Sequence, residues 1–361
     1  MKILTVIGAR PQFIKAATVS RLLHDDEYAE IEEVVVHTGQ HYDDNMSQSF
    51  FNELNMPIPK YNFEVGSGTH GQQTGAIIIG LEKVIKLEEP DWILVYGDTN
   101  STIAAALVAA KTPCKLAHVE SGLRSYRWGM PEEVNRIVTD RLSNLLFCPT
   151  ILAQKNLVSE GGNQKTIVTG DVMYDSFVYY SNILDYDAII QKNNLKKSEY
   201  LLVTIHRAEN TDDKRRLGNI ISALRSISRK VEVVLPIHPR TKKMIQKFSL
   251  SLEGIKVIEP VSYLSMIAFI VNSKAVVTDS GGLQKEAYFA KKKCLTIRDE
   301  TEWMETLENG WNKLVSPCNE SKLIDNLNNI LSLDCSDLKY NFHYGSGNAA
   351  KKIIDAIVDF E

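Results

Sequence analysis

Short apolar runs alternate with longer amphipathic stretches along almost the whole 361-residue chain. The short runs are rich in Val, Ile and Leu and are bounded by Gly, Asp or Pro, which is typical of buried strands. The longer stretches carry apolar residues at helical spacing and predict helices. Strands that alternate with helices form parallel sheets covered on both faces, so the pattern predicts an α/β protein.

The expected strands fall into two series, separated by a polar and mostly helical stretch at 171–196. The first series comprises 3–7, 34–38, 92–96, 116–119, 145–148 and 166–168, and the second comprises 201–204, 231–236, 256–258, 275–278 and 294–297. Helices are expected between them, for example at 72–85 and 132–145. We therefore expect two Rossmann-like doubly wound domains, 1–170 and 171–347, with a ligand cleft between them. A C-terminal helix at 348–361 could pack on either domain, including back on the first.

Composition narrows the class of protein. The chain is 44% hydrophobic and 24% charged, as in ordinary soluble proteins, and its net charge of −4 does not favour a nucleic-acid partner. No apolar run approaches the roughly 20 residues of a membrane span, and the chain begins directly with a strand rather than a signal peptide. Five scattered cysteines lack metal-ligand spacing, which indicates buried thiols in a reducing cytoplasm.

Acidic residues occupy the ends of several expected elements. Glu120 follows an expected strand directly, and Asp98 follows another after a single glycine. Glu132 and Glu133 lie at the start of an expected helix. Ligands of open α/β sheets bind beyond the carboxyl ends of strands, so these carboxylates are candidates for chemistry. The alternative for Asp98 is that it only caps the following helix.

Two strand–helix connections resemble anion sites. After the first strand, a glycine permits a tight turn, a proline suits the first helical turn, and Arg10 offers a forked donor for phosphate. In the second series, successive N–H groups of Ser280, Gly281 and Gly282 would form an anion nest at a helix start. Glu286, about one turn later, could reach ribose hydroxyls, so a sugar nucleotide fits better than free phosphate. An ordinary helix start is the alternative at both places.

Two histidines follow strands of the second series. His206 is followed by Arg207, and His238-Pro239-Arg240 repeats the pattern after the next strand. A histidine facing a cleft can carry charge near neutral pH, although a lone histidine is more often structural. Neither a G-x-G-x-x-G fingerprint nor a phosphate-binding P-loop motif is present, so dinucleotide binding is disfavoured.

Together these motifs resemble one family, the non-hydrolysing UDP-N-acetylglucosamine 2-epimerases. The matching blocks span nearly the whole chain in the family's order: Gly8 to Lys15, Gly97-Asp-Thr99, His118 to Arg124, Pro131 to Arg136, His206-Arg207, Thr278 to Gln284, and Arg298-Asp299. The resemblance implies two Rossmann-like domains, akin to GT-B glycosyltransferases, with UDP bound in the cleft.

The resemblance also implies residue roles and a mechanism. Asp98, Glu120 and Glu132 would be catalytic carboxylates, and His206 a catalytic histidine. The substrate-binding positions would be Arg10, Lys15, Arg207, His238, Arg240, Tyr263, Ser280, Gly281, Gly282, Glu286 and Arg298. Such an enzyme eliminates UDP across C1–C2 to form a 2-acetamidoglucal and then adds it back, with no metal, NAD or other cofactor. A homodimer that supplies surface polysaccharide synthesis, such as lipopolysaccharide O-antigen, is expected.

Some positions depart from the best-known members. Gln12 replaces a glutamate, and Trp303 stands where an arginine is common. The Gln and Arg of a second, regulatory UDP-sugar site are replaced, at Asp43 and near Ala76. These departures favour UDP-2,3-diacetamido-2,3-dideoxy-glucuronic acid over UDP-GlcNAc as substrate, and hyperbolic kinetics. The alternatives are a GT-B glycosyltransferase, a hydrolysing epimerase and a non-catalytic UDP-sugar-binding protein.

Overall fold

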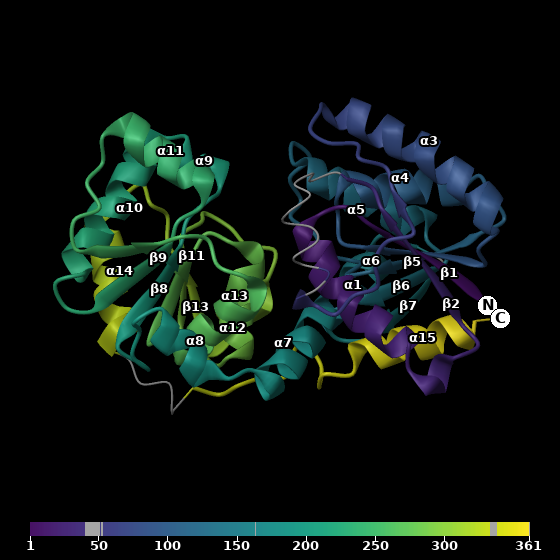
Figure 1. The fold of residues 1–361 in the computed structure, drawn as a ribbon. Coiled ribbons are helices and arrows are strands. Elements are labelled where there is room, and N and C mark those ends of the chain that lie inside the picture. Colours follow the sequence, from purple (N-terminus) through teal and green to yellow (C-terminus); the bar gives the residue numbers. More distant parts are fainter. Residues whose placement is uncertain (40–50, 52, 163, 333–337, 361) are drawn as a thin grey trace. The chain divides into compact units, whose positions relative to one another are not determined.

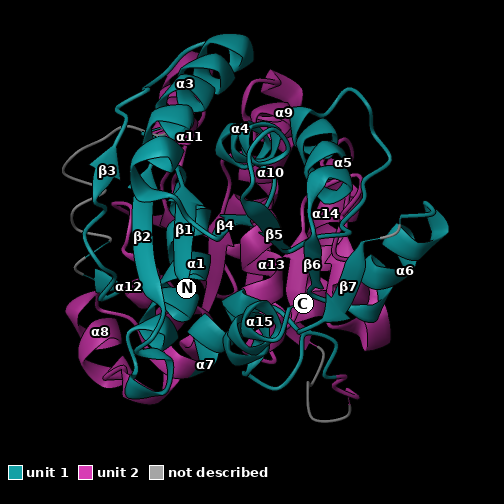
Figure 2. Ribbon diagram, turned by 90° about the vertical axis from the view of Figure 1, so that its right-hand side faces the viewer, with its two compact units in different colours: residues 1–178, 342–361 teal, residues 179–341 magenta. Residues whose placement is uncertain are grey.

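A computed structural model describes residues 1–39, 51, 53–162, 164–332 and 338–360. The chain forms two compact units, residues 1–178 with 342–361, and residues 179–341 (Figure 2). The second unit is thus inserted in sequence between two parts of the first. Each unit is described by itself.

Unit 1 contains a seven-stranded parallel sheet in the order β3-β2-β1-β4-β5-β6-β7. Its strands are β1 Lys2–Ile7, β2 Glu32–His37, β3 Tyr61–Asn62, β4 Trp92–Tyr96, β5 Lys115–Val119, β6 Leu145–Cys148 and β7 Lys165–Val168. Its helices are α1 Arg10–Leu23, α3 His70–Glu88, α4 Asn100–Ala109, α5 Pro131–Leu142, α6 Ile151–Ser159 and α15 Ala349–Val358, with a 3-10 turn at Asp26–Tyr28. Helix α7, Val172–Ile183, runs across the boundary between the units.

Unit 2 contains a six-stranded parallel sheet in the order β10-β9-β8-β11-β12-β13. Its strands are β8 Tyr200–Thr204, β9 Glu232–Pro236, β10 Ile255–Ile258, β11 Ala275–Thr278, β12 Cys294–Thr296 and β13 Asn312–Leu314. Its helices are α8 Tyr186–Lys192, α9 Ala208–Thr211, α10 Lys214–Ile227, α11 Pro239–Phe248, α12 Tyr263–Asn272, α13 Gly281–Phe289 and α14 Glu320–Ser332, with a 3-10 segment at Met304–Gly310. Helices cover both faces of each sheet (Figure 1). The predicted α/β class is confirmed.

Both strand orders reverse direction at one point. In unit 1 the chain moves outward from β1 to β2 and β3 on one side, and from β4 to β7 on the other. In unit 2 the same reversal lies between β8 and β11. Adjacent loops diverge at such a switch point and leave a crevice at the carboxyl ends of the strands, where ligands of open α/β sheets bind. The connections after β1, β4, β8 and β11 are therefore the places to look for a site.

The helix that ends the chain belongs to unit 1. Helix α15 lies along α1 (Figure 1), and the Tyr28 hydroxyl donates to Asp355 Oδ1 over 2.6 Å. Ile353, Ile354 and Ile357 of this helix are buried. The backbone N–H of Ala350 donates to Asp175 Oδ2 over 2.8 Å. The last helix therefore covers α1, the helix whose start carries Arg10.

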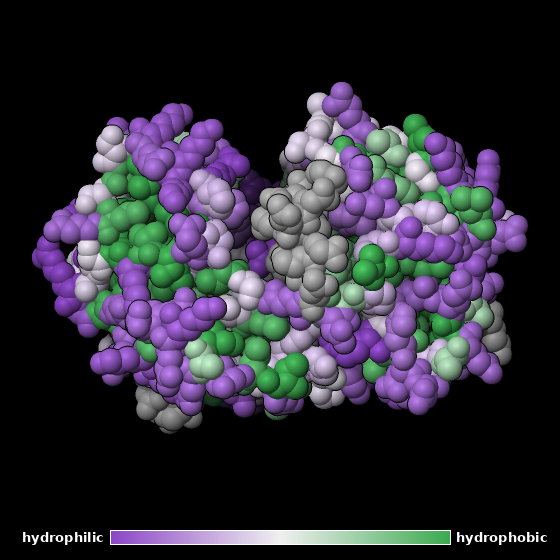
Figure 3. Space-filling view, viewed as in Figure 1, coloured by the Kyte–Doolittle hydropathy of each residue, from purple (hydrophilic) through white to green (hydrophobic). Residues whose placement is uncertain are grey.

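The central strands are buried from end to end. All five residues of β4 and of β8 are buried. This burial explains why these strands appear in the sequence as continuous apolar runs without alternation. On the face shown in Figure 3, hydrophilic side chains are spread over both units. Within the described ranges, none of the helices combines the length and apolarity of a membrane span.

Candidate functional site

The carboxylates predicted in unit 1 lie beyond neighbouring strands. Strands β4 and β5 pair in parallel with Tyr96 opposite Val119, so Asp98 and Glu120 follow at the same edge of the sheet. Helix α4 is capped by Thr99, whose side chain accepts the Thr102 N–H. The alternative that Asp98 only caps this helix is therefore wrong. Its side chain is 33% exposed, and Asn135 Nδ2 holds its backbone carbonyl at 2.9 Å.

Lys15 and Glu120 form an ion pair next to Gly97. The Lys15 ammonium from α1 contacts Glu120 Oε2, and both side chains are nearly buried. A Cβ at Gly97 would lie 3.2 Å from Lys15 Nζ and 3.3 Å from Glu120 Oε2. Gly97 also has a φ of +65°, which favours glycine. The glycine before Asp98 thus lets the ion pair approach the backbone that carries the first carboxylate.

The two adjacent glutamates at the start of α5 have different environments. Glu133 is 1% exposed, and its carboxylate accepts the N–H groups of Ser125 and Tyr126. Arg136 Nε lies 3.2 Å from the same carboxylate, so Glu133 clamps the loop before the helix. Glu132 is exposed and lies close enough to Asp98 to influence its pKa. Glu132 is therefore the one available to a substrate.

Arg136 holds the first carboxylate. Its Nη2 lies 3.3 Å from Asp98 Oδ2, while its own side chain is 4% exposed. Burial raises the pKa of Asp98 above its usual range, and the charges of Glu120 and Glu132 raise it further. Arg136 and Lys15 lower this pKa but do not cancel the rise. A carboxyl group with a raised pKa is suited to exchanging protons near neutral pH.

We expect Asp98→Asn to resist urea better than the wild type near pH 7. The folded state binds the Asp98 proton more tightly than the unfolded chain does, so wild-type stability falls as pH rises from the unfolded pKa of about 3.9 through the raised folded value. Asparagine carries no ionisable proton and removes this loss. Urea unfolding of both proteins near pH 4 and near pH 7 measures the difference in their free energies of unfolding. The prediction would be contradicted if the variant were more stable than the wild type by a larger margin at pH 4 than at pH 7.

The connection after β1 presents Arg10 at the first position of α1, partly exposed. Gln12 holds this connection in place. Its Oε1 accepts the N–H groups of Gly8 and Ala9, and its Nε2 donates to the Tyr96 carbonyl over 2.8 Å. A glutamate carboxylate could not donate to that carbonyl. The amide therefore joins the start of α1, with Arg10, to the end of β4 before Asp98.

Asp279 organises the site of unit 2. It is fully buried at the end of β11, and its carboxylate accepts the N–H groups of His206 and Arg207 from the loop after β8. His206 Nδ1 lies 3.2 Å from Asp279 Oδ1, and the His206 side chain is 40% exposed. Burial alone would raise the pKa of Asp279, but the hydrogen bonds and charge of His206, Arg207 and Asn210 lower it. Asp279 therefore stays ionised and orients His206.

The start of α13 has the features of an anion site. Ser280 caps the helix by accepting the Leu283 N–H over 3.4 Å, and Gly281 and Gly282 open its first turn. First-turn N–H groups have no partner inside a helix and attract anions. A Cβ at Gly281 would lie 2.8 Å from Glu302 Oε1, so a carboxylate already lies against this turn.

Charged and aromatic side chains pack behind that turn. Arg298 is buried, and its Nη1 lies 3.1 Å from Glu302 Oε2. Trp303 is also buried, and Lys285 Nζ lies 3.6 Å from the centre of its ring. Glu286 is 5% exposed on the inner side of α13. The indole therefore supports the glycine turn from behind.

The remaining predicted residues of unit 2 lie on three helix starts. His238 caps α11, where its Nδ1 accepts the Arg240 N–H, and its ring lies 5.7 Å from that of His206. Arg240 pairs with Asp212. Tyr263 is buried at the start of α12. Arg207 directly precedes α9, and its side chain is partly exposed and makes no capping hydrogen bond.

Sequence reasoning missed Arg136 and Asp279 as site residues. For Asp279 a signal existed, because it directly follows the expected strand 275–278. In the structure β8 and β11 pair with Thr204 opposite Thr278, which places Asp279 beside the loop with His206. Arg136 is one helical turn from Glu132, which places both on one face of α5. Asp43 lies outside the described residues. Within the ranges that the structure describes, no group of three or more His, Cys, Asp or Glu side chains could hold a metal ion.

Known proteins of similar sequence point to one family. A family model described as UDP-N-acetylglucosamine 2-epimerase matches residues 24–358. The chain is 46% identical to a UDP-N-acetylglucosamine 2-epimerase homolog of Methanococcus maripaludis, over 99% of both chains. It is also 46% identical to the UDP-2,3-diacetamido-2,3-dideoxy-D-glucuronate 2-epimerase of Pseudomonas aeruginosa, over 98% of this chain and 99% of the relative.

A solved structure agrees with the sequence relatives. The crystal structure of Methanocaldococcus jannaschii UDP-GlcNAc 2-epimerase in complex with UDP-GlcNAc and UDP matches with a TM-score of 0.89 and 41% identity, over 99% of each chain. The family model covers more than half of the chain, and these relatives cover nearly all of it. The chain belongs to the UDP-N-acetylglucosamine 2-epimerase family.

Proposed function

We propose that the chain is a non-hydrolysing 2-epimerase of a UDP-2-acetamido sugar. The observation that carries this proposal is the cluster of Asp98, Glu120 and Lys15 at the switch point of unit 1. Inverting C2 requires one group to take a poorly acidic proton and another to return it, which is work for positioned carboxylates. A glycosyltransferase of similar shape would have no evident use for this cluster, and a binding protein would need no proton exchange.

Unit 2 supplies the groups suited to the UDP moiety. We assign the diphosphate to the turn of Ser280, Gly281 and Gly282, the ribose to Glu286, and the uracil to the region of Tyr263. His206, oriented by Asp279, stabilises the charge that develops on the departing diphosphate. In unit 1, Arg10 at the start of α1 is a further cation suited to an anionic group of the substrate. Elimination of UDP gives the 2-acetamidoglucal, and UDP adds back after the proton arrives on the other face.

UDP-2,3-diacetamido-2,3-dideoxy-glucuronic acid is the substrate that we favour. The Pseudomonas aeruginosa relative is named for this sugar and is 46% identical. The uronate differs from UDP-GlcNAc by a second acetamido group at C3 and by a C6 carboxylate. The carboxylate requires a cation, and Arg207 suits this role. Within the described part of the chain, its backbone N–H donates to Asp279 and its backbone carbonyl accepts the N–H groups of Asn210 and Thr211, while its guanidinium has neither a hydrogen bond nor an ion pair. Arg240 is already held by Asp212 and by Thr211 Oγ1.

Proton NMR of the sugar after incubation with each UDP-sugar tests the function. We expect the gluco uronate to equilibrate with its manno epimer faster than UDP-GlcNAc does, without release of free sugar. Release of free sugar and UDP would indicate a hydrolysing enzyme. No change in either sugar would overturn the proposed function.

Arg207→Gln is expected to raise KM for the uronate by about 10- to 100-fold, since a hydrogen bond to a charged group contributes roughly 1.5–3 kcal/mol. KM for UDP-GlcNAc, which lacks the carboxylate, should change little. Arg215→Gln, on the exposed first turn of α10, removes the same charge from unit 2 and serves as the matched control. Steady-state kinetics on both sugars measure these effects. An equal rise in KM for both sugars would disprove recognition of the carboxylate by Arg207.

The cellular setting is also proposed. A sugar of this kind is a precursor for surface polysaccharides such as lipopolysaccharide O-antigen, and UDP-sugars are made in the cytoplasm. The described cysteines include no disulfide, and burial raises the pKa of the Cys148 and Cys294 thiols to about 12 each, which fits a reducing compartment. We propose a homodimer on the family resemblance, and sedimentation equilibrium tests it.

A further inference from the structure

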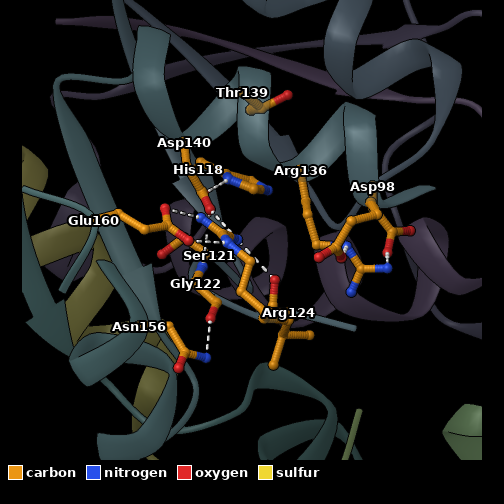
Figure 4. A network of polar contacts seen from close by, with 12 residues as sticks. Asp98, His118, Ser121, Gly122, Arg124, Arg136, Thr139, Asp140, Asn156 and Glu160 are labelled. Carbon is orange, nitrogen blue, oxygen red and sulfur yellow. Dashed lines mark hydrogen bonds and ion pairs between the residues drawn. The ribbon is translucent and has the colours of Figure 1, made fainter. Parts of the chain in front are cut away.

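A network of buried charged side chains lies to one side of Asp98 in unit 1 (Figure 4). His118 comes from β5, Asp140 from α5, and Arg124 from the loop between them. His118 and Asp140 are 0% and 2% exposed, respectively, so neither is placed to touch a substrate. Burying charged groups is costly unless they are paired, which raises the question of what this network does.

His118 joins the network to the backbone before Asp98. Its Nδ1 lies 2.7 Å from Asp140 Oδ1, and its Nε2 lies 2.7 Å from the Gly97 carbonyl oxygen. A carbonyl oxygen only accepts, so Nε2 carries a proton and donates it. The Gly97 N–H in turn donates to the Val119 carbonyl over 3.0 Å. Gly97, the residue before Asp98, is therefore held through both its backbone N–H and its carbonyl.

Asp140 holds the backbone on both sides of Glu120. On one side it binds His118, two residues earlier, and on the other its Oδ2 accepts the Gly122 N–H over 3.2 Å. Glu120 itself has a φ of +70°, a left-handed conformation that is unfavourable for a residue with a side chain. Such a conformation persists only where the surroundings enforce it. The Asp140 carboxylate is placed to do so.

The outer end of the network is anchored on α6. Arg124 Nη1 lies 2.7 Å from Asp140 Oδ2, and its Nε lies 2.6 Å from Glu160 Oε1. Its Nη2 donates to the other Glu160 oxygen over 2.8 Å. Asp140 thus binds three groups from β5 and the loop after it, and Arg124 joins that arrangement to Glu160, the residue that ends α6.

We propose that His118 and Asp140 are positioning residues that set the separation of the Asp98 and Glu120 carboxylates for proton transfer at C2. The two carboxylates are carried by short turns rather than by regular elements, and one buried ion pair braces both turns. This inference rests on the proposed function of the cluster. It assigns the two residues to the chemical step and not to binding of the UDP moiety.

The expected result is a fall in kcat with little change in KM. His118→Gln and Asp140→Asn should each lower kcat by about 10- to 10³-fold, because a displacement of about 1 Å at the reacting groups costs up to about 10²-fold and the two carboxylates move together. KM should stay within about threefold. His118→Gln keeps an amide donor for the Gly97 carbonyl, whereas His118→Leu keeps none, so the leucine variant should be slower.

Thr139→Val is the matched control. Thr139 precedes Asp140 on α5 and is fully buried, and its hydroxyl has no partner among the described residues. This variant alters the packing beside the network without touching its hydrogen bonds, so kcat should stay within about twofold of wild type. Thermal unfolding identifies any variant that does not fold. In that case kcat of His118→Gln, the mildest change, tests the proposal. Folded His118→Gln with wild-type kcat, or Thr139→Val with an equal loss, would overturn the proposal.

A second measurement does not need turnover. Titration of the ¹³C-labelled Asp98 carboxyl by NMR reports its distance from Glu120, Lys15 and Arg136, the charges that shift its pKa. In His118→Gln this pKa should move by at least about half a unit. If the wild type epimerised no UDP-sugar, the proposed function would fail, and this titration would still decide the inference. An unchanged Asp98 pKa in His118→Gln would refute it.

Discussion

Asp98→Asn and Glu120→Gln are each expected to lower kcat by about 10²–10⁴-fold, the usual contribution of a general acid or base. Each change keeps the shape of the side chain and removes its ability to take and return a proton. Glu132→Gln should lower kcat to a similar extent, because Glu132 is the exposed member of the Glu132–Glu133 pair. Initial rates of epimerisation, followed by NMR, measure the loss.

Asp91→Asn provides the matched control for these variants. Asp91 directly precedes β4, whereas Asp98 follows it, and its Oδ2 accepts the Lys2 N–H over 2.7 Å. An asparagine oxygen can still accept that bond, so turnover should stay near wild type. Wild-type turnover in Asp98→Asn or Glu120→Gln would remove that residue from the mechanism.

In D₂O, the product sugar is expected to carry deuterium at C2 almost completely. The proton is taken by one group and a different one is returned, and the partly exposed Asp98 carboxyl can exchange with solvent between turnovers. Proton NMR of the isolated product should show loss of the H2 signal, while the non-exchanging H1 signal serves as the internal reference. Retention of protium at C2 would favour internal hydrogen transfer and contradict elimination and re-addition.

Most of the fold could be predicted because its strands are buried on both faces. Continuous apolar runs such as β4 and β8 stand out against polar helix surfaces. Strands β3 and β13 were missed, because two or three residues are too few to form a pattern. The helix expected at 132–145 ends at Leu142, and its last predicted residue begins β6 instead. An apolar residue at such a junction fits both elements equally well.

The site was predictable only where it depends on strand ends. Asp98 and Glu120 follow adjacent strands, so their common edge follows from the alternation of strands and helices. The choice between Glu132 and Glu133 could not be made, because both are glutamates at one helix start and only the loop that folds over Glu133 distinguishes them. Partners distant in sequence, such as Asp140 for His118, depend on the packing of a helix against a sheet and leave no local pattern.

The return of the last helix to unit 1 has a consequence for synthesis on the ribosome. Unit 2 is contiguous in the chain, so it can bury its core as soon as residue 341 has been made. Unit 1 must wait for α15, and until then the surface of α1 that Ile353, Ile354 and Ile357 will cover stays open. The helix that positions Arg10 and Lys15 is thus covered only after all of unit 2 has been made. An apolar surface of α1 therefore stays exposed until α15 has been made, which makes α1 the natural place for a chaperone to bind.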